Sequence, residues 1–196
     1  MTLEVSPVPV AVEVDLLARI RKLSPRLGHT VLVAIDGRSG AGKSTLAARL
    51  AASMGAMTVQ LEYLYPGWDG LDAGVQNAVD TVLKPFSRGA AADVPQWDWQ
   101  SNKWGIPMRI APPRYLLLEG VGAASAAIRR WTDLAIWLEL PQEERLLRAR
   151  VRGWETYEGH WDSWAVQEDA LMARENLPQS ADLVLVGSQD LPVGPQ

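Results

Sequence analysis

The sequence predicts an α/β fold in three layers, with a mostly parallel five-stranded sheet that carries helices on both faces. Short apolar runs rich in β-branched residues alternate along the chain with longer segments of helical periodicity. Parallel strands need a crossover between them, usually a helix, so this alternation favours a parallel sheet. One apolar run, at residues 30–35, also leads straight into a glycine-rich loop that a helix-forming segment follows. We therefore expect strand, loop and helix to form the first unit of the sheet.

Composition narrows the class of protein. The chain has 196 residues, of which 47% are hydrophobic and 21% charged, values that suit one globular domain over 1–196. The formal net charge of −4 provides no basic field for nucleic acid, and the absence of cysteine excludes disulfides and thiolate metal sites. No apolar run approaches the ~20 residues of a transmembrane helix, and no secretory signal is visible. We expect a cytoplasmic protein without nucleic-acid or membrane partners, and the sequence leaves its oligomeric state open.

Two units are expected in the first part of the chain. The N-terminal segment 1–28 carries a helix, because Leu16 and Ile20 lie on one apolar stripe that ends before Pro25. Residues 30–54 follow as the strand–loop–helix unit, since good helix formers come directly after the glycines.

The rest of the chain continues the alternation. The expected strands lie at 57–61, 115–118, 134–138 and 183–186, and the expected helices at 71–83, 123–129, 141–152 and 160–175. Pro85 is expected to end the helix at 71–83, because a proline ring clashes with a helix interior. The stretch 86–113 interrupts the alternation and is rich in proline and tryptophan, so we expect a hairpin or an ordered loop. The segment 142–160 is expected to form a lid.

The glycine-rich loop predicts a phosphate-binding site. It matches the pattern G-x-x-x-x-G-K-[ST] at every fixed position. The glycines let successive backbone N–H groups face an anion, and the helix N-terminus adds partial positive charge. Lys43 is expected to reach the β- and γ-phosphates, and Ser44 to ligate Mg²⁺, which predicts the P-loop NTPase fold with ATP and Mg²⁺ as cofactors. The residues assigned to the cofactor are Gly37, Arg38, Ser39, Gly40, Ala41, Gly42, Lys43, Ser44 and Thr45.

Three carboxylates close to strand ends are candidates for phosphotransfer chemistry. Glu62 is the candidate base or acceptor-orienting group, and the alternative is a solvated loop carboxylate. Glu119 ends the strand at 115–118, where open α/β sheets bind ligands, so it could contact the metal or the acceptor. Asp36, directly before the loop, could order metal-bound water or tether the loop. The metal-binding candidates are Ser44, Asp36 and Glu119.

Arginines of the lid segment are candidates to stabilise the transferred phosphate. Arg148 and Arg152 share one helical face at i, i+4 and could clamp it. The alternative is a solvated face paired with neighbouring glutamates, and Arg145 is expected to make such surface pairs. The catalytic candidates are Lys43, Glu62, Arg148 and Arg152.

Aromatic residues gather in the irregular segments. The chain has nine tryptophans, and several of them fall outside the expected core elements. A pocket lined by aromatic rings would suit a ring-bearing acceptor such as a nucleoside. The alternative is that these side chains form the core of a loop subdomain. Asp98 could bond a substrate hydroxyl. The substrate-binding candidates are Glu62, Tyr65, Trp68, Asp98, Trp99 and Glu119.

In order and spacing, these segments resemble the uridine kinase-like branch of P-loop kinases. The resemblance covers most of residues 30–186 and is carried by IDGRSGAGKST at 35–45, LEYLYPGW at 61–68, LLLEGV at 116–121 and LAIWLELPQEERLLRARVR at 134–152. The resemblance implies a kinase that phosphorylates a hydroxyl group of a small molecule. Uridine kinases carry an aspartate, the base of the family, where this chain has Glu62. Their lid helix usually ends in Arg-Asp, and this one ends in Arg152-Gly153.

The leading functional hypothesis is an ATP- and Mg²⁺-dependent phosphotransferase that acts on the hydroxyl of a small metabolite, with a nucleoside as one candidate. Two alternatives stay open. The departures from the family pattern suggest a nucleotide-binding regulatory or adaptor module with little catalysis, and an antibiotic- or toxin-type phosphotransferase would use the same parts on another acceptor. The chain has no Asn/Thr-Lys-x-Asp guanine-recognition motif, which favours ATP over GTP.

Overall fold

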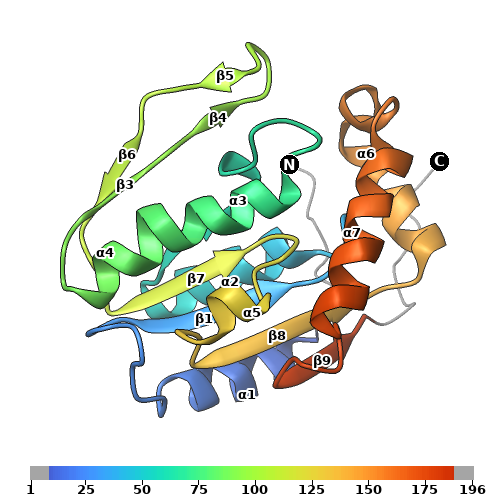
Figure 1. Cartoon of the computed structure of the whole chain (residues 1–196). Helices are drawn as coiled ribbons and strands as arrows, with labels where there is room; N and C mark the ends of the chain where they lie inside the picture. Colours follow the sequence, from blue (N-terminus) through green and yellow to red (C-terminus); the bar gives the residue numbers. More distant parts are fainter. Residues whose placement is uncertain (1–8, 188–196) are drawn as a thin grey trace.

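The structure, a computed structural model, describes residues 9–187, without the side chains of residues 10 and 152–156. Its centre is a five-stranded sheet in the order β2-β7-β1-β8-β9 (Figure 1). All neighbouring strands are parallel, so the expected α/β fold is confirmed and the sheet is parallel throughout. The strands are β1 (Val31–Asp36), β2 (Met57–Gln60), β7 (Tyr115–Glu119), β8 (Leu134–Glu139) and β9 (Leu183–Val186).

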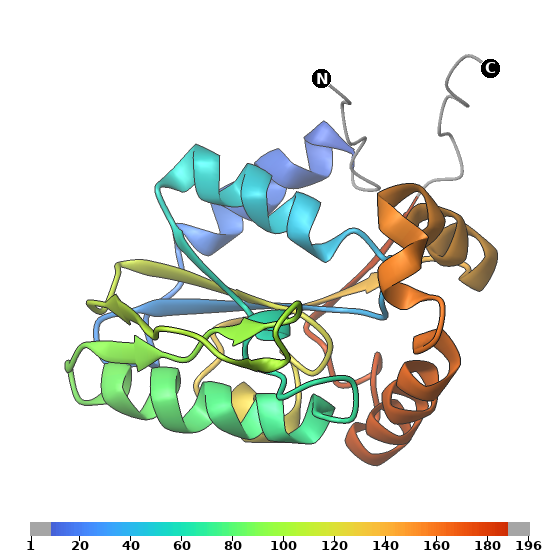
Figure 2. The same ribbon diagram turned by 90° about the horizontal axis from the view of Figure 1, so that it is seen from above.

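Helices cover both faces of the sheet and complete the three layers (Figure 2). One face carries α1 (Val10–Ile20) and α2 (Lys43–Met54). The other face carries α3 (Leu71–Ala78) with its continuation, and the short α5 (Ala126–Arg129). Burial on both faces explains why the three inner strands, β1, β7 and β8, read as nearly continuous apolar runs in the sequence.

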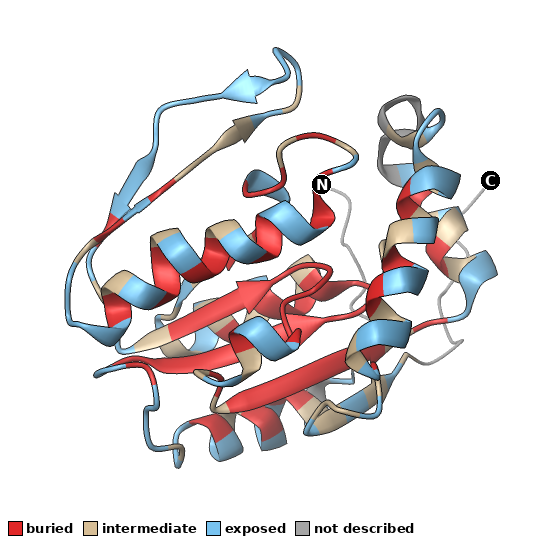
Figure 3. Cartoon of the chain, viewed as in Figure 1, coloured by how far each residue is buried: buried red, intermediate tan, exposed pale blue. Residues whose placement is uncertain are grey.

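Alternate residues of the central strand β1 pack in two separate hydrophobic cores. Leu32 and Ala34 pack in the core beneath α3, whereas Val33 and Ile35 pack in the core beneath α1 and α2. Successive side chains of a strand point to opposite faces, so a strand with both faces covered is apolar along most of its length, and in β1 only the last residue, Asp36, is charged. All six residues of β1 are buried, and the sheet forms the buried centre of the molecule in Figure 3.

The helix that begins at Leu71 does not end before Pro85, contrary to the sequence-based expectation. It passes from α3 through a π-helical stretch, η2 (Val79–Leu83), into α4 (Lys84–Ser87). The backbone N–H of Lys84 bonds the carbonyl of Val79, five residues earlier, directly before the proline. Because proline lacks an N–H and crowds the preceding turn, the wider π turn accommodates it with the chain still helical.

Residues 92–110 form a long arm of two short antiparallel strand pairs. The pairs are β3 (Ala92–Val94) with β6 (Met108–Ile110), and β4 (Trp97–Asp98) with β5 (Lys103–Trp104). The arm lies outside α3, and much of its surface is exposed (Figures 1 and 3). The arm brings Trp99 to the 3-10 turn η1 (Leu61–Tyr63). There the Trp99 Nε1 donates a hydrogen bond to the Glu62 carbonyl at 3.2 Å.

Two helices follow β8 and stand beside the end of the sheet (Figure 1). They are α6 (Gln142–Tyr157), in the expected lid segment, and α7 (Trp161–Glu175). None of the helices within residues 9–187 is both long and apolar enough to cross a membrane.

We predict that Gly74→Ala destabilises the fold although alanine is the better helix former. Gly74 lies in α3, and a β-carbon there would overlap the ring of Tyr65. That ring is buried, and its hydroxyl donates a 2.8 Å hydrogen bond to the carbonyl of Val121, so it cannot easily move. Overpacking of this kind costs about 1–3 kcal/mol, which exceeds the gain of about 1 kcal/mol in helix propensity.

Urea denaturation of the wild type and Gly74→Ala measures this loss. Gly159→Ala is the matched control, because no atom lies within 4 Å of the β-carbon it would add. Equal stability of Gly74→Ala and the wild type would contradict the close packing of α3 on Tyr65.

Candidate active site

A pocket of about 240 Å³ lies at the carboxyl ends of the central strands. Its lining residues come from the P-loop after β1, the segment after β2, the end of β7, the arm, and helices α6 and α7. Open α/β sheets bind their ligands at this edge, because the loops that follow neighbouring strands converge there.

The P-loop depends on glycine at positions where a side chain has no space. Gly37, Gly40 and Gly42 have φ angles of 142°, 82° and 97°, which other residues rarely adopt. A β-carbon on Gly37 would lie 2.5 Å from the Leu138 carbonyl oxygen, and one on Gly40 would lie 2.5 Å from the Arg145 carbonyl oxygen. The loop therefore takes a tight path that only glycine permits.

The N-terminus of α2 faces the pocket. Gly42, in a left-handed conformation, precedes the helix without a capping side chain, and Gly42, Lys43 and Ser44 all line the pocket. The first N–H groups of a helix have no intrahelical acceptor, so they favour an anion at this position. The Lys43 Nζ donates a 3.1 Å hydrogen bond to the Arg38 carbonyl, which holds the ammonium beside the loop. These residues fit the phosphates of a nucleotide.

Asp36 holds two loops together. Its Oδ1 accepts hydrogen bonds from the backbone N–H groups of Gly37 at 2.7 Å and Gly122 at 3.0 Å, and its Oδ2 accepts one from Ala124 at 2.8 Å. Burial raises the pKa of this carboxyl to about 6, and the N–H donors and Lys43 oppose that rise. The side chain is fully buried and does not line the pocket. The geometry supports the tether, and Asp36 is not among the lining residues that include Ser44 and Glu119.

Glu119 and Glu62 reach the pocket from neighbouring strands. β2 and β7 pair with Gln60 opposite Glu119, and the Gln60 Nε2 donates a 2.8 Å hydrogen bond to the Glu119 Oε1. Glu62 lies two residues beyond Gln60 and is exposed at the pocket wall. Strand pairing therefore brings both candidate carboxylates to the pocket that Ser44 also lines.

The donor set suits a metal that arrives with a nucleotide. Ser44 and Glu119 offer a hydroxyl and a carboxylate, the oxygen ligands that Mg²⁺ prefers. Among residues 9–187, no group of three or more His, Asp and Glu side chains could form a metal site. Mg²⁺ usually keeps several waters and binds through one or two protein oxygens plus phosphates, so this pair fits its coordination.

Aromatic side chains form the opposite wall of the pocket. Trp68 is the centre of the group: its ring stacks on His160 with centroids 4.7 Å apart and contacts Trp99 at 4.9 Å and Trp164 at 6.0 Å. Tyr65 also lines the pocket, but its hydroxyl is bonded to the Val121 carbonyl, so it contributes its ring. Rings from separate elements thus support one another around the cavity.

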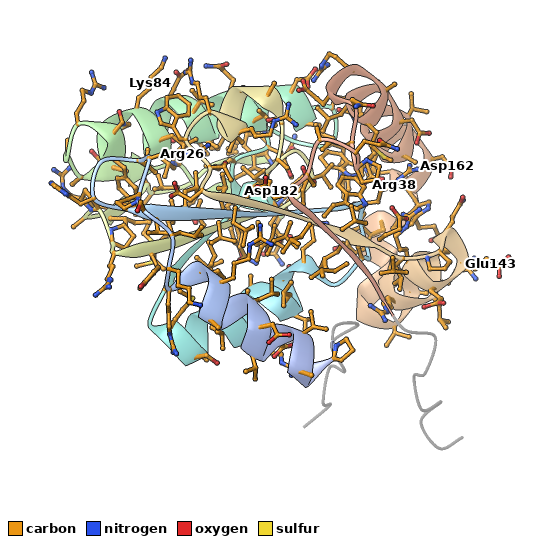
Figure 4. All side chains as sticks on the ribbon, turned by 90° about the horizontal axis from the view of Figure 1, so that it is seen from below. Arg26, Arg38, Lys84, Glu143, Asp162 and Asp182 are labelled. Carbon is orange, nitrogen blue, oxygen red and sulfur yellow. The ribbon has the colours of Figure 1, made fainter. Side chains whose placement is uncertain are left out.

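Glu168 on α7 fastens the tip of the P-loop, a contact that sequence reasoning missed. Its Oε1 accepts hydrogen bonds from the Ser39 backbone N–H at 2.8 Å and the Ser39 hydroxyl at 2.7 Å. Its Oε2 accepts one from the Arg38 Nε at 2.8 Å, and Figure 4 labels Arg38 at the edge of the sheet near the lid helices. The carboxylate is 2% exposed, which a single sequence does not indicate for a glutamate in a polar helix.

Arg145 is buried against the same loop, and its expected surface ion pairs are wrong. Its Nε donates to the Leu140 carbonyl at 3.1 Å, and a terminal nitrogen donates to the Ser39 carbonyl at 3.2 Å. Burial lowers the pKa of this guanidinium, and the neighbouring charge of Arg38 adds to that effect. Arg145 and Glu168 therefore hold Ser39 through its carbonyl and its N–H, respectively.

Several other candidates lie outside the pocket lining. Arg148 does not line the pocket, whereas its neighbour Ala149 on α6 does. The side chain of Arg152 lies outside the described residues. Thr45, in the first turn of α2, and the loop residues Gly37, Arg38 and Ala41 are not part of the pocket lining either.

Asp98 does not line the pocket either, which corrects its expected contact with substrate. Its Oδ1 accepts hydrogen bonds from the backbone N–H groups of Gln100 and Ser101, and its Oδ2 accepts one from the Ser101 hydroxyl. Aspartate commonly bonds the backbone two residues ahead in turns, so the position of Asp98 at the tip of the arm determines its role.

We predict that Asp36→Asn lowers the free energy of unfolding by about 1–3 kcal/mol, the range for a buried donor left without a partner. The amide NH₂ of asparagine would face a backbone N–H where the carboxylate now accepts a bond. Urea denaturation is the measurement. Asp98→Asn, at an exposed turn, is the control and should change stability by about 0.5 kcal/mol or less. Unchanged stability in Asp36→Asn would rule out the tether.

We also predict that Glu168→Ala weakens ATP binding by about tenfold, equivalent to about 1.4 kcal/mol. The tip of the P-loop would lose the acceptor for Arg38 and for two groups of Ser39. Isothermal titration calorimetry measures the affinity. Asp169→Asn is the control, because Asp169 also pairs with Arg38 but is 64% exposed and does not contact the loop backbone. Equal losses in both variants would contradict a specific role for Glu168.

No protein-family model and no curated protein matches the chain. Among solved structures, it is similar to a possible uridine kinase from Bacillus stearothermophilus, with a TM-score of 0.66, 16% identity, and coverage of 90% of this chain and 98% of that chain. It is also similar to a candidate fructose transport system kinase from Silicibacter sp. TM1040, with a TM-score of 0.57, 20% identity, and coverage of 89% and 97%. The chain therefore shares the fold of these two solved structures, with a parallel five-stranded sheet between layers of helices.

Proposed function

We propose that this protein is an ATP- and Mg²⁺-dependent phosphotransferase that acts on a hydroxyl of a small metabolite. The observation that carries the proposal is that one pocket is lined by the phosphate-binding residues Lys43 and Ser44 and by the carboxylates Glu62 and Glu119. A kinase needs a nucleotide cradle and an acceptor site within reach of each other, because the γ-phosphoryl group passes directly between them.

The residues divide into two groups by position. Lys43 and the backbone at the start of α2 would bind the β- and γ-phosphates, and Ser44 and Glu119 would hold Mg²⁺. The metal, when bound, supplies positive charge to the phosphate oxygens. Glu62 would accept the hydroxyl proton as the acceptor oxygen bonds the γ-phosphorus and the bond to the bridging oxygen breaks. The aromatic wall would keep water, a competing acceptor, out of the site.

A nucleotide-binding module with little catalysis is the second candidate. Among the described side chains, no arginine lines the pocket, and Lys43 is the cation that does. P-loop enzymes commonly use an arginine to stabilise the charge of the transition state, so a site without one would bind ATP and transfer slowly. An antibiotic- or toxin-type phosphotransferase would share the parts of the first proposal and differ in its acceptor.

Two variants separate these functions. Lys43→Ala should abolish product formation, because an ammonium next to the transferred phosphate is worth on the order of 100-fold in rate or more. Glu62→Gln should keep ATP affinity and lose about 10²–10⁴-fold in turnover, the range for a general base. ADP release with a panel of nucleosides, sugars, vitamins and amino alcohols gives the rates, and calorimetry gives the ATP affinity.

Lys84→Ala serves as the control, because Lys84 lies on α4 and pairs with Asp80 away from the pocket. Tight ATP binding without phosphorylation of any panel member would contradict the kinase and support the binding module. Full turnover in Glu62→Gln would remove the proposed role of that carboxylate.

A further inference from the structure

The half of the pocket away from the P-loop combines aromatic rings with negative charge. The rings that line it are those of Tyr65, Trp68, Trp99, Tyr157, Trp161 and Trp164. Glu62 lies in the same lining, and Glu119, the candidate metal ligand, lines the pocket as well. This combination favours a positively charged acceptor, because the faces of aromatic rings and carboxylates both attract cations.

The rings are held in place before any ligand arrives. Trp68 is stacked on His160 on one side and contacts Tyr157 at 5.8 Å, and Tyr157 contacts Trp161 at 6.5 Å. Trp99 is anchored by the hydrogen bond from its Nε1 to the Glu62 carbonyl. The rings of Trp68, Trp99, Tyr157 and Trp161 are half-buried, so part of each ring remains available to the cavity.

Among the described side chains away from the P-loop, the charges that line the cavity are negative. Among the described side chains that line it, Lys43 is the cation, and it belongs to the phosphate cradle. A carboxylate or phosphate on the acceptor would therefore lie near Glu62 without a described positive partner. Like charges in a partly dry site repel strongly, so these carboxylates select against such acceptors.

The cavity has room for a small acceptor beside the phosphates. Its volume of about 240 Å³ includes the space beside Ser39–Ser44, where nucleotide phosphates would lie, and it opens to solvent. A cavity of about 150 Å³ binds benzene, so a small acyclic molecule or a single ring fits.

We propose that the acceptor site takes a small organic cation that bears a hydroxyl, such as an amino alcohol or a quaternary ammonium alcohol. The ammonium group contacts the faces of Trp68, Trp99 and Trp161, and the hydroxyl points to Glu62. The inference rests on the proposed function and names its substrate class. In the transfer, the hydroxyl oxygen bonds the γ-phosphorus, its proton passes to Glu62, and ADP leaves with the bridging oxygen.

A matched pair of ligands tests the charge requirement. Choline and 3,3-dimethylbutan-1-ol have nearly the same shape, and only choline is positively charged. We expect choline to bind at least about tenfold more tightly when calorimetry is performed with ADP and Mg²⁺ present. Uridine and glycerate complete the set as a neutral nucleoside and an anionic alcohol. Equal binding of the matched pair, or tighter binding of uridine or glycerate than of choline, overturns the proposal.

Two substitutions test whether the acceptor binds between Glu62 and the aromatic rings. Glu62→Gln should reduce the preference for choline over its neutral analogue, whereas Trp99→Leu should weaken both ligands. Trp104→Leu is the control, because Trp104 lies on the same arm and packs on Trp97 outside the pocket lining. A choline affinity that is unchanged in Trp99→Leu and Glu62→Gln overturns the assigned location.

The binding measurement distinguishes this inference from the proposed function, because it does not depend on phosphoryl transfer. If choline binds with the predicted preference but neither choline nor any other alcohol of the panel is phosphorylated, the kinase is contradicted and the cation site stands. If choline does not bind and an uncharged or anionic alcohol of the panel is phosphorylated, the cation site is overturned and the kinase stands.

Discussion

The active-site end of this molecule depends on the buried carboxylate of Asp36. It accepts three backbone hydrogen bonds, and their donors lie in the loop after β1 and in the loop after β7. The loop after β1 leads to Lys43 at the start of α2, and the loop after β7 follows Glu119. The hydrogen bonds of Asp36 therefore set the distance between the phosphate-binding residues and the candidate metal ligand. A buried charge is costly unless it is paired or bonded, and the three donors and Lys43 provide that compensation.

Ser39 shows how the lid side of the molecule is coupled to the same loop. Arg145 on α6 bonds its carbonyl, and Glu168 on α7 bonds its N–H and hydroxyl. Both side chains are almost completely buried, so each is held in one geometry and the P-loop tip is fixed from two helices. If α7 were displaced, Glu168 would move away from its hydrogen-bond donors on Ser39 and Arg38. The position of α7 is therefore linked to the conformation of the P-loop.

Sequence reasoning succeeded where the determinants are local. The apolar strands and the glycine spacing at 37–42 are visible in short windows, because burial on both faces and a positive φ restrict residue type at each position. It failed for side chains whose environment is set by distant segments. Arg145 was expected to make surface ion pairs and Glu168 was not singled out, because both become buried only when α6 and α7 pack on the P-loop. Asp98 was expected to contact substrate, but it accepts hydrogen bonds within the turn of the arm. Pro85 read as a helix end because a π turn leaves no simple pattern in the sequence.

The glutamate at position 62 is consistent with a small acceptor. The backbone of Glu62 is in the 3-10 turn η1 and its carbonyl is fixed by the Trp99 indole, so its side-chain length decides where the carboxylate reaches. Compared with the aspartate expected from the resemblance to uridine kinases, glutamate extends the carboxylate by one bond of about 1.5 Å. A longer base and several indole rings both take space from the cavity. Glu62 and the indole rings therefore act in the same direction, toward an acceptor that is compact and whose hydroxyl lies close to the phosphates.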